Sequence, residues 1–363
     1  MANSGGRRRE ASSSRRNRWT SVVCLLVLAP VCAEYLAAYD DSTGDPGALL
    51  LGLAFFVPLY GCPALLIREI ARRTRMTWIG VVALATAFGI VQAGIVDQSI
   101  FRLTYRDLPA WADWATPTYI EPLGFSAYLA LTFVTGHVIA SFCAPIAIAE
   151  ALVPERRTEA WLGPVGLGVT AGLYLTAAGV ILDEHLVTES AAISTTQFVV
   201  TMLVVVALVV VAVTAGRARR EATDRWCPPA LVLFLGGGAL GVGKEYFGVT
   251  WPGVAAHAAL LAVVAGLLLR FARSTSWTRV HELAVAAGFV TALAISGFMT
   301  TPLFGEVSTF QRYAHSSVLA VAITALVLVG LRSTARDGGS PPEAEPDVVP
   351  PPAATPGSRK RDR

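Results

Sequence analysis

The chain has 363 residues, of which 54% are hydrophobic and only 15% are charged. Soluble domains carry about a quarter charged residues, so this composition excludes an ordinary soluble globular protein. The net charge is +3, but the basic residues are concentrated in a few short segments between apolar blocks. These blocks are roughly 20 residues long, which is the length of a helix that crosses the hydrocarbon core of a bilayer.

The apolar blocks predict an all-α protein, a polytopic transmembrane helix bundle of about ten spans, with residues 19–331 as the transmembrane domain. A transmembrane β-barrel is not expected, because its strands alternate apolar and polar residues and these blocks are continuously apolar. The predicted spans cover residues 19–39, 47–67, 78–100, 124–148, 161–183, 194–215, 228–246, 253–271, 282–304 and 313–331.

The first predicted span follows a basic cytoplasmic tail at residues 1–18, which contains six arginines. A basic segment before an apolar one is also typical of a secretory signal peptide, with Val31-Cys32-Ala33 as a poor cleavage site. Because the apolar run continues past this site, we expect an uncleaved first helix. At the other end, residues 332–363 are rich in Pro, Asp and Glu, and this cytoplasmic tail is expected to be disordered because it cannot bury enough apolar surface to fold.

The basic residues also predict the orientation of the bundle, because short cytoplasmic loops of membrane proteins are enriched in Arg and Lys. If the N-terminus is cytoplasmic, only four of the 29 basic residues lie outside, namely Arg102, Arg106, Lys244 and Arg312. Both termini are therefore predicted to be cytoplasmic. Arginine greatly outnumbers lysine, and Ala, Val and Gly are frequent. This is a codon signature of a GC-rich bacterial genome, so the bacterial plasma membrane is the expected location.

Ionisable residues recur where the predicted spans end on the outer side. Charges in membrane segments are costly and usually face a bundle interior or a wet cavity. They therefore predict a shared outer site that binds a cation, relays protons or holds a divalent metal through carboxylate oxygens. The alternative is that they are hydrated at headgroup level and only mark helix ends. The candidates are Glu34, Asp97, Asp183, Glu184, His185, Lys244 and Glu245.

His137 is the most deeply placed titratable residue, near the middle of the fourth predicted span. Ser141 follows one helical turn later on the same face. Histidine titrates near neutral pH, so His137 is a candidate proton relay. The alternative is a neutral histidine that hydrogen-bonds a neighbouring helix.

The second and third spans carry features with both structural and functional interpretations. Pro58 and Pro63 predict a kink in the second span, and broken helices line sites in many transporters. In the third span, Gln92 and Asp97 lie among small residues that favour close helix packing. The basic segment at residues 68–73 is interpreted as a loop that sets the topology.

Acidic residues in the outer loops allow a second function. Membrane glycosyltransferases that use polyprenyl-linked sugars carry acidic residues in their first outer loop, where this chain has Asp40 and Asp41 in a shorter loop. The loop at residues 101–123 adds Asp107 and Asp113 among aromatic residues, which are equally typical of an interfacial belt. A membrane enzyme that acts on a lipid-linked substrate at the outer face is therefore the alternative to a transporter.

The segment Tyr60-Gly61-Cys62-Pro63-Ala64-Leu65-Leu66-Ile67-Arg68-Glu69, with Trp78-Ile79-Gly80 and Gly89-Ile90, resembles uncharacterised multi-pass membrane proteins of bacteria. The resemblance covers roughly the first 100 residues. It implies no known activity, so no functional residue is carried over from it.

The residues themselves favour a transporter or permease-like protein for a small solute or ion, with His137 and the outer carboxylates as candidates for coupling to protons. A non-catalytic membrane partner subunit is a third hypothesis, beside the enzyme. No cofactor motif is present, and the five cysteines show no spacing typical of a metal site. The expected partners are the lipid bilayer and a small-molecule or ion substrate, with no nucleic acid.

Overall fold

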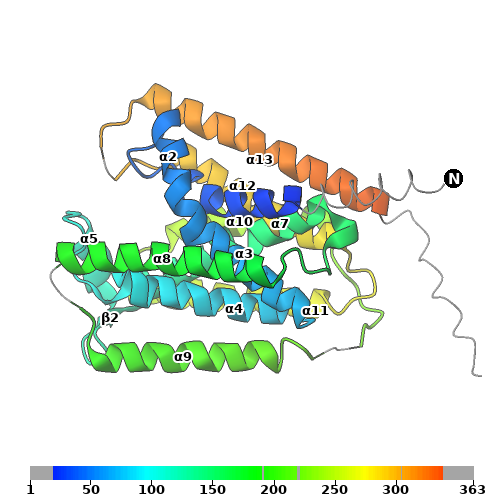
Figure 1. Cartoon of the computed structure of the whole chain (residues 1–363), viewed down its shortest axis with the longest axis horizontal. Helices are drawn as coiled ribbons and strands as arrows, with labels where there is room; N and C mark the ends of the chain where they lie inside the picture. Colours follow the sequence, from blue (N-terminus) through cyan, green and yellow to red (C-terminus); the bar gives the residue numbers. More distant parts are fainter. Residues whose placement is uncertain (1–18, 190–191, 219–220, 304, 338–363) are drawn as a thin grey trace, which may run out of the picture.

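The computed structural model describes residues 19–337, except residues 190–191, 219–220 and 304 (Figure 1). The predicted basic tail at residues 1–18 and the chain beyond residue 337 lie outside the described part. The described chain is mainly helical, and its sheet structure is a short antiparallel hairpin of β1 (Tyr119–Ile120) and β2 (Phe125–Ser126). The all-α prediction is confirmed.

The long helices run back and forth along the long axis of the molecule (Figure 1). The first helix begins at Trp19, at the same end of the bundle where the last one finishes. We call this the arginine end, because it contains the basic end of α3, and the opposite end the hairpin end, because it contains β1 and β2. The helices are the first helix (Trp19–Tyr35), α2 (Pro46–Phe56), α3 (Cys62–Arg73), α4 (Trp78–Val91), α6 (Ala127–Gly136), α7 (Ala144–Leu152), α8 (Pro164–Glu189), α9 (Thr195–Val213), α10 (Ala230–Gly243), α11 (Trp251–Phe271), α12 (Arg279–Met299) and α13 (Thr309–Asp337).

Short elements complete the connections. Four π-helical segments continue or join the long helices, namely Val31–Tyr35, Val57–Gly61, Gln92–Val96 and His137–Cys143. The loop between α4 and α6 contains the short helix α5 (Trp111–Ala115) and two 3₁₀ turns at Ser99–Phe101 and Thr116–Thr118. Two further 3₁₀ turns lie at Pro154–Arg156 and Lys244–Tyr246.

Eight helices of the described chain are long and apolar enough to cross a membrane, when helices joined through π-helical segments are counted as one. The first helix is apolar but shorter, and α10 has 14 residues. The chain is therefore a membrane-embedded helical protein, in which eight of the ten predicted spans reach the full length. The eight are Pro46–Arg73, Trp78–Val96, Ala127–Leu152, Pro164–Glu189, Thr195–Val213, Trp251–Phe271, Arg279–Met299 and Thr309–Arg336.

Local sequence explains where several helices begin. The Asp45 carboxylate caps α2 by accepting from the backbone N–H of Gly47 at 2.8 Å, and Pro46 occupies the first turn, where its missing N–H costs nothing. At the other end of the chain, α13 continues past the predicted boundary at residue 331. Thr334 is buried there and its hydroxyl donates to the carbonyl of Gly330 at 2.9 Å, so residues 332–337 of the predicted tail are helical.

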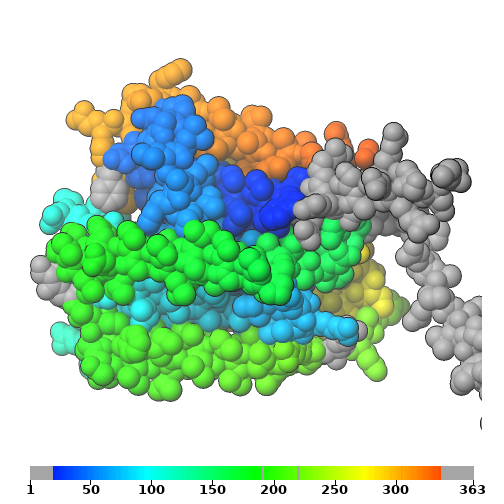
Figure 2. Space-filling view, in the orientation of Figure 1, coloured from blue at the N-terminus to red at the C-terminus, as the bar shows by residue number. Residues whose placement is uncertain are grey.

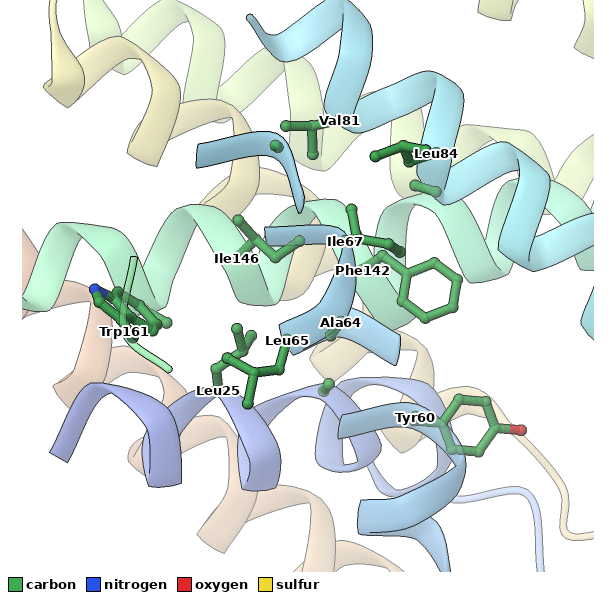
Figure 3. Packing of buried hydrophobic residues seen from close by; sticks show 14 of the residues in the cluster. Leu25, Tyr60, Ala64, Leu65, Ile67, Val81, Leu84, Phe142, Ile146 and Trp161 are labelled. Atoms are coloured by element: carbon green, nitrogen blue, oxygen red, sulfur yellow. The ribbon is translucent and has the colours of Figure 1, made fainter. Parts of the chain in front are cut away.

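The main apolar core lies between the first helix, α3, α4 and the helix formed by α6 and α7. Leu25, Leu65, Ile67 and Ile146 are fully buried in it (Figure 3). Trp161 lies at one side of this aliphatic cluster and Tyr60 at another (Figure 3). The core therefore separates two regions that contain polar side chains.

The helices α10 and α12 pack against each other through glycines. A Cβ atom on Gly288 would lie 2.3 Å from the carbonyl oxygen of Phe234 and 3.2 Å from the Cα of Gly237. Only residues without a side chain let the two backbones approach this closely. By contrast, α8 and α9 extend along one face of the molecule (Figure 2), where most of their apolar side chains are exposed in the isolated chain, as expected for a lipid-facing surface.

Candidate functional site

Each of the first four predicted spans contains a π-helical segment, which ends the helix in the first and third spans and lies within it in the second and fourth. A π-helical segment contains an extra residue per turn, which locally disrupts the regular hydrogen bonding, and such segments are frequent at functional sites. The causes are visible in the sequence, because Pro30, Pro58 and Pro145 lie in or beside three of the segments and lack the N–H of a regular helix. The remaining segment, Gln92–Val96 in the third span, contains Gly94. The segment His137–Cys143 contacts the segments of the first and second spans.

Glu34 lies in the first of these segments, and only 7% of its surface is exposed. Its carboxylate accepts hydrogen bonds from the hydroxyls of Tyr39 and Tyr60. Among the described residues, no Arg, Lys or His forms an ion pair with it, and the charges that act on it are the carboxylates of Asp40 and Asp97. Glu34 is thus a buried acid whose direct partners are neutral phenols.

Asp97 follows the third π-helical segment and accepts a hydrogen bond from the backbone N–H of Ser99 at 2.9 Å. Burial raises the pKa of Asp97 to about 6, although the hydrogen bonds from Ser99 and the positive charge of Arg106 act in the opposite direction. This carboxyl therefore changes its protonation state close to neutral pH.

Four tyrosines surround these acids, and we call Glu34, Asp97, Tyr39, Tyr60, Tyr105 and Tyr174 the tyrosine–carboxylate cluster. Burial and then the charge of Glu34 raise the pKa of Tyr39, so this phenol stays a neutral hydrogen-bond donor. The Tyr60 hydroxyl points away from the aliphatic core (Figure 3). The Tyr174 hydroxyl lies within electrostatic range of Asp97, is buried, and makes no hydrogen bond within the described chain.

His137 adjoins the cluster through its ring. The imidazole stacks on Tyr60, with 5.9 Å between ring centroids, and on Phe142. Its Nδ1 lies 3.3 Å from the Ser141 hydroxyl, which is the residue that the helical spacing placed on the same face. The histidine is partly buried near the middle of its span, so both its relay role and its role as a satisfied core residue stay hypotheses.

The loop after Asp97 covers the cluster on the side of α8. The Arg106 guanidinium forms an ion pair with Glu184, and the Arg106 backbone N–H donates to Glu189 Oε1 at 2.6 Å. Arg102 Nη2 lies 3.2 Å from His185 Nε2. The predicted site residues Glu184 and His185 therefore anchor this loop.

The aromatic residues of the same loop form a small packed core. Trp111 stacks on Tyr105, with 4.5 Å between ring centroids, and its indole N–H donates to the Arg102 carbonyl at 3.0 Å. Trp111 is buried and also stacks on Phe133 of α6. These rings hold the loop against the helices. Trp111, which is buried, is therefore not available to bind a sugar.

The other predicted site residues do not join the cluster. Lys244 and Glu245 form an ion pair with each other at the end of α10. Asp40 accepts a hydrogen bond from the Ser42 hydroxyl and lies within electrostatic range of Glu34. Four other predicted acids are exposed to solvent. No group of three or more His, Cys, Asp or Glu side chains in the described chain lies close enough together to hold a metal ion. The exposed acids are Asp41, Asp107, Asp113 and Asp183.

A second polar site, which the sequence interpretation missed, lies at the arginine end. The segment at residues 68–73 was expected to be a basic loop, and this prediction is wrong, because α3 continues to Arg73. Arg68 and Glu69 are fully buried and form an ion pair at 2.7 Å. Arg68 also pairs with Glu150 of α7 at 3.2 Å, and Arg72 binds the same carboxylate through two nitrogens.

Trp161 completes this arginine–glutamate network, which we define as Arg68, Glu69, Arg72, Glu150 and Trp161. The Arg68 guanidinium lies over the indole ring, 3.6 Å from its centroid. Glu69 accepts the backbone N–H of Trp161 at 2.7 Å and of Leu162 at 3.1 Å. Arg68 Nη2 donates to the carbonyls of Arg156 and Arg157. The burial cost of these charges is offset because donors and acceptors are paired throughout.

No protein-family model matches the chain, and no curated protein or solved structure gives a significant match.

Proposed function

We propose that this protein is a proton-coupled transporter of a small solute or ion in the bacterial plasma membrane, with Glu34 as the residue that carries the coupling proton. One observation supports this most strongly. Glu34 is buried against two neutral phenols and faces the acids Asp40 and Asp97, with no basic partner in the described chain. A buried carboxylate needs a compensating positive charge, which is supplied by a bound proton or a bound cation.

The placement of the site supports alternating exposure to the two sides. The tyrosine–carboxylate cluster belongs to the hairpin end, where Asp97 and the loop after it lie. At the arginine end, the arginine–glutamate network joins α3, α7 and the segment that follows α7. Glu34 and Tyr60 lie in π-helical segments and Asp97 directly follows one, and broken helices form the substrate sites of many transporters.

The orientation follows from charge. Most basic residues of the described chain lie at the arginine end, including Arg72, Arg73 and Arg75, and short basic loops face the cytoplasm. In this proposal both termini are cytoplasmic and the hairpin end is extracytoplasmic. The tyrosine–carboxylate cluster then takes up its proton or solute from the outside.

The alternative of an outer-face enzyme has less support. It assigns chemistry to Asp40, Asp41, Asp97 and the loop at residues 101–123. Asp40 and Asp97 act electrostatically on Glu34, but Asp41 and the loop acids Asp107 and Asp113 are exposed. A non-catalytic partner subunit does not require a buried acid without a basic partner. For these reasons the transporter is preferred.

The test uses purified protein in proteoliposomes that contain a pH-sensitive dye. A panel of small cations, amino acids and sugars is added outside, and proton movement is recorded for the wild type, Glu34→Gln and the control Glu245→Gln. We expect at least one solute to drive proton movement in the wild type and the control but not in Glu34→Gln. Equal proton movement in Glu34→Gln, or no solute-dependent movement with any member of the panel, would overturn the proposal.

A further inference from the structure

We infer that the tyrosine–carboxylate cluster binds an organic ammonium ion, which competes with the proton for Glu34. This inference rests on the proposed function and names its substrate class. It depends on three observations, which are the charge balance of the cluster, its aromatic composition and one buried hydroxyl without a partner.

The charge balance favours a cation. The carboxylates of Asp40 and Asp97 both act electrostatically on Glu34. The basic residue that acts on Asp97 is Arg106, and its guanidinium is already paired with Glu184. The region therefore carries more negative than positive charge, and an anionic or neutral solute would leave that excess uncompensated.

The aromatic composition favours an organic cation over a divalent metal ion. Calcium takes six to eight oxygen ligands, several of them carboxylates, whereas no three potential metal-ligating side chains meet in the described residues. Tyr39, Tyr60 and Tyr105 act electrostatically on one another or on the two acids. Phenols attract cations through the negative potential of their ring faces, and the Arg106 guanidinium already lies 5.5 Å from the centroid of the Tyr105 ring.

Tyr174 supplies the third observation. Only 7% of its surface is exposed, and its ring packs against Phe88 with 5.6 Å between centroids. Its hydroxyl forms no hydrogen bond within the described chain and lies within electrostatic range of Asp97. Buried hydroxyls are normally hydrogen-bonded. An ammonium N–H between Tyr174 and the acids would satisfy this oxygen.

These features predict an exchange of one proton for one organic cation. When Glu34 is protonated, the attraction for an ammonium ion falls, and when the ammonium ion binds, the proton is released. Because one proton competes with one cation, the apparent affinity should fall about tenfold for each pH unit below the pH at which Glu34 becomes protonated.

The probes are butylammonium and tetramethylammonium chloride, with sodium chloride, potassium chloride and butanol as controls. Binding to the purified full-length protein is measured by thermal stabilisation, and proton release by a pH dye in weakly buffered solution. We expect stabilisation and proton release with an ammonium probe and neither with the controls. In Tyr174→Phe, which keeps the ring, butylammonium should bind about tenfold more weakly, because a hydrogen bond to a charged group is lost.

Three variants separate binding from folding. Glu34→Gln should lose both responses, Glu34→Asp should keep part of them, and the exposed control Glu245→Gln should match the wild type. Stabilisation that is equal with sodium chloride or butanol, or unchanged in Glu34→Gln, would overturn the ammonium site. Ammonium binding without proton flux in proteoliposomes would instead refute transport, and Glu34-dependent flux of another solute without ammonium binding would refute only the substrate class.

Discussion

Glu69→Gln tests whether the buried arginine–glutamate network holds the arginine end together. Glu69 is fully buried and accepts from Arg68 Nη1 at 2.7 Å, from the backbone N–H groups of Trp161 and Leu162, and from Arg73 Nη2 at 3.4 Å. The glutamine amide removes the negative charge and places a donor where one carboxylate oxygen accepts.

The magnitude follows from the charges that are left behind. Without Glu69, Arg68 and Arg72 share the single carboxylate of Glu150, so one buried guanidinium loses its counter-charge. Breaking a buried ion pair on one side costs about 3–5 kcal/mol. The matched control is Glu159→Gln, because Glu159 is 55% exposed and pairs with Arg156 at 2.9 Å. Exposed pairs contribute only about 0–1 kcal/mol.

The assay is reversible unfolding of both variants in mixed micelles, followed by circular dichroism during titration with a denaturing detergent. We expect the free energy of unfolding of Glu69→Gln to be lower than that of the control by about 3 kcal/mol or more. A difference below about 1 kcal/mol would refute the argument, because it would mean that Arg68 is hydrated in the folded protein rather than buried.

Two further predictions concern Asp97 and the α10–α12 contact. The pKa of Asp97 is raised from 3.8 to about 6 in the folded protein. Between these pH values the folded state binds more protons than the unfolded state. The stability of the wild type should therefore fall as pH rises from about 4 to 6. Asp97→Asn should not show this loss of up to about 3 kcal/mol; parallel pH profiles of unfolding in the two proteins would contradict the assignment. Gly288→Ala should destabilise the protein by about 1–3 kcal/mol, because the new Cβ would lie 2.3 Å from the Phe234 carbonyl oxygen. The control Gly266→Ala has no atom within 4 Å and should be neutral or slightly stabilising in the same unfolding assay.

The position of most helices could be predicted from the sequence because hydrophobicity acts locally. A run of roughly 20 apolar residues must be helical in a bilayer, since only a helix satisfies the backbone hydrogen bonds within the segment. Eight predicted spans accordingly appear as helices long enough to cross a membrane. The sequence also singled out Glu34 and Asp97, because a charge at such a position is costly, and the structure buries Glu34.

The partners of these residues are decided only by the tertiary structure. Glu34 meets Tyr60, and Glu69 meets Trp161, because the helices that carry them pack together, and no local pattern encodes such a pairing. At Arg68, where the sequence predicts a basic loop, the same packing forms a buried network. A charged residue is buried only where distant segments supply its counter-charge and hydrogen bonds, here Glu150 and the Arg157 carbonyl. Hydrophobicity along the chain is therefore enough to predict a membrane helix bundle with costly charges, whereas the packing of distant helices sets which of those charges share a site.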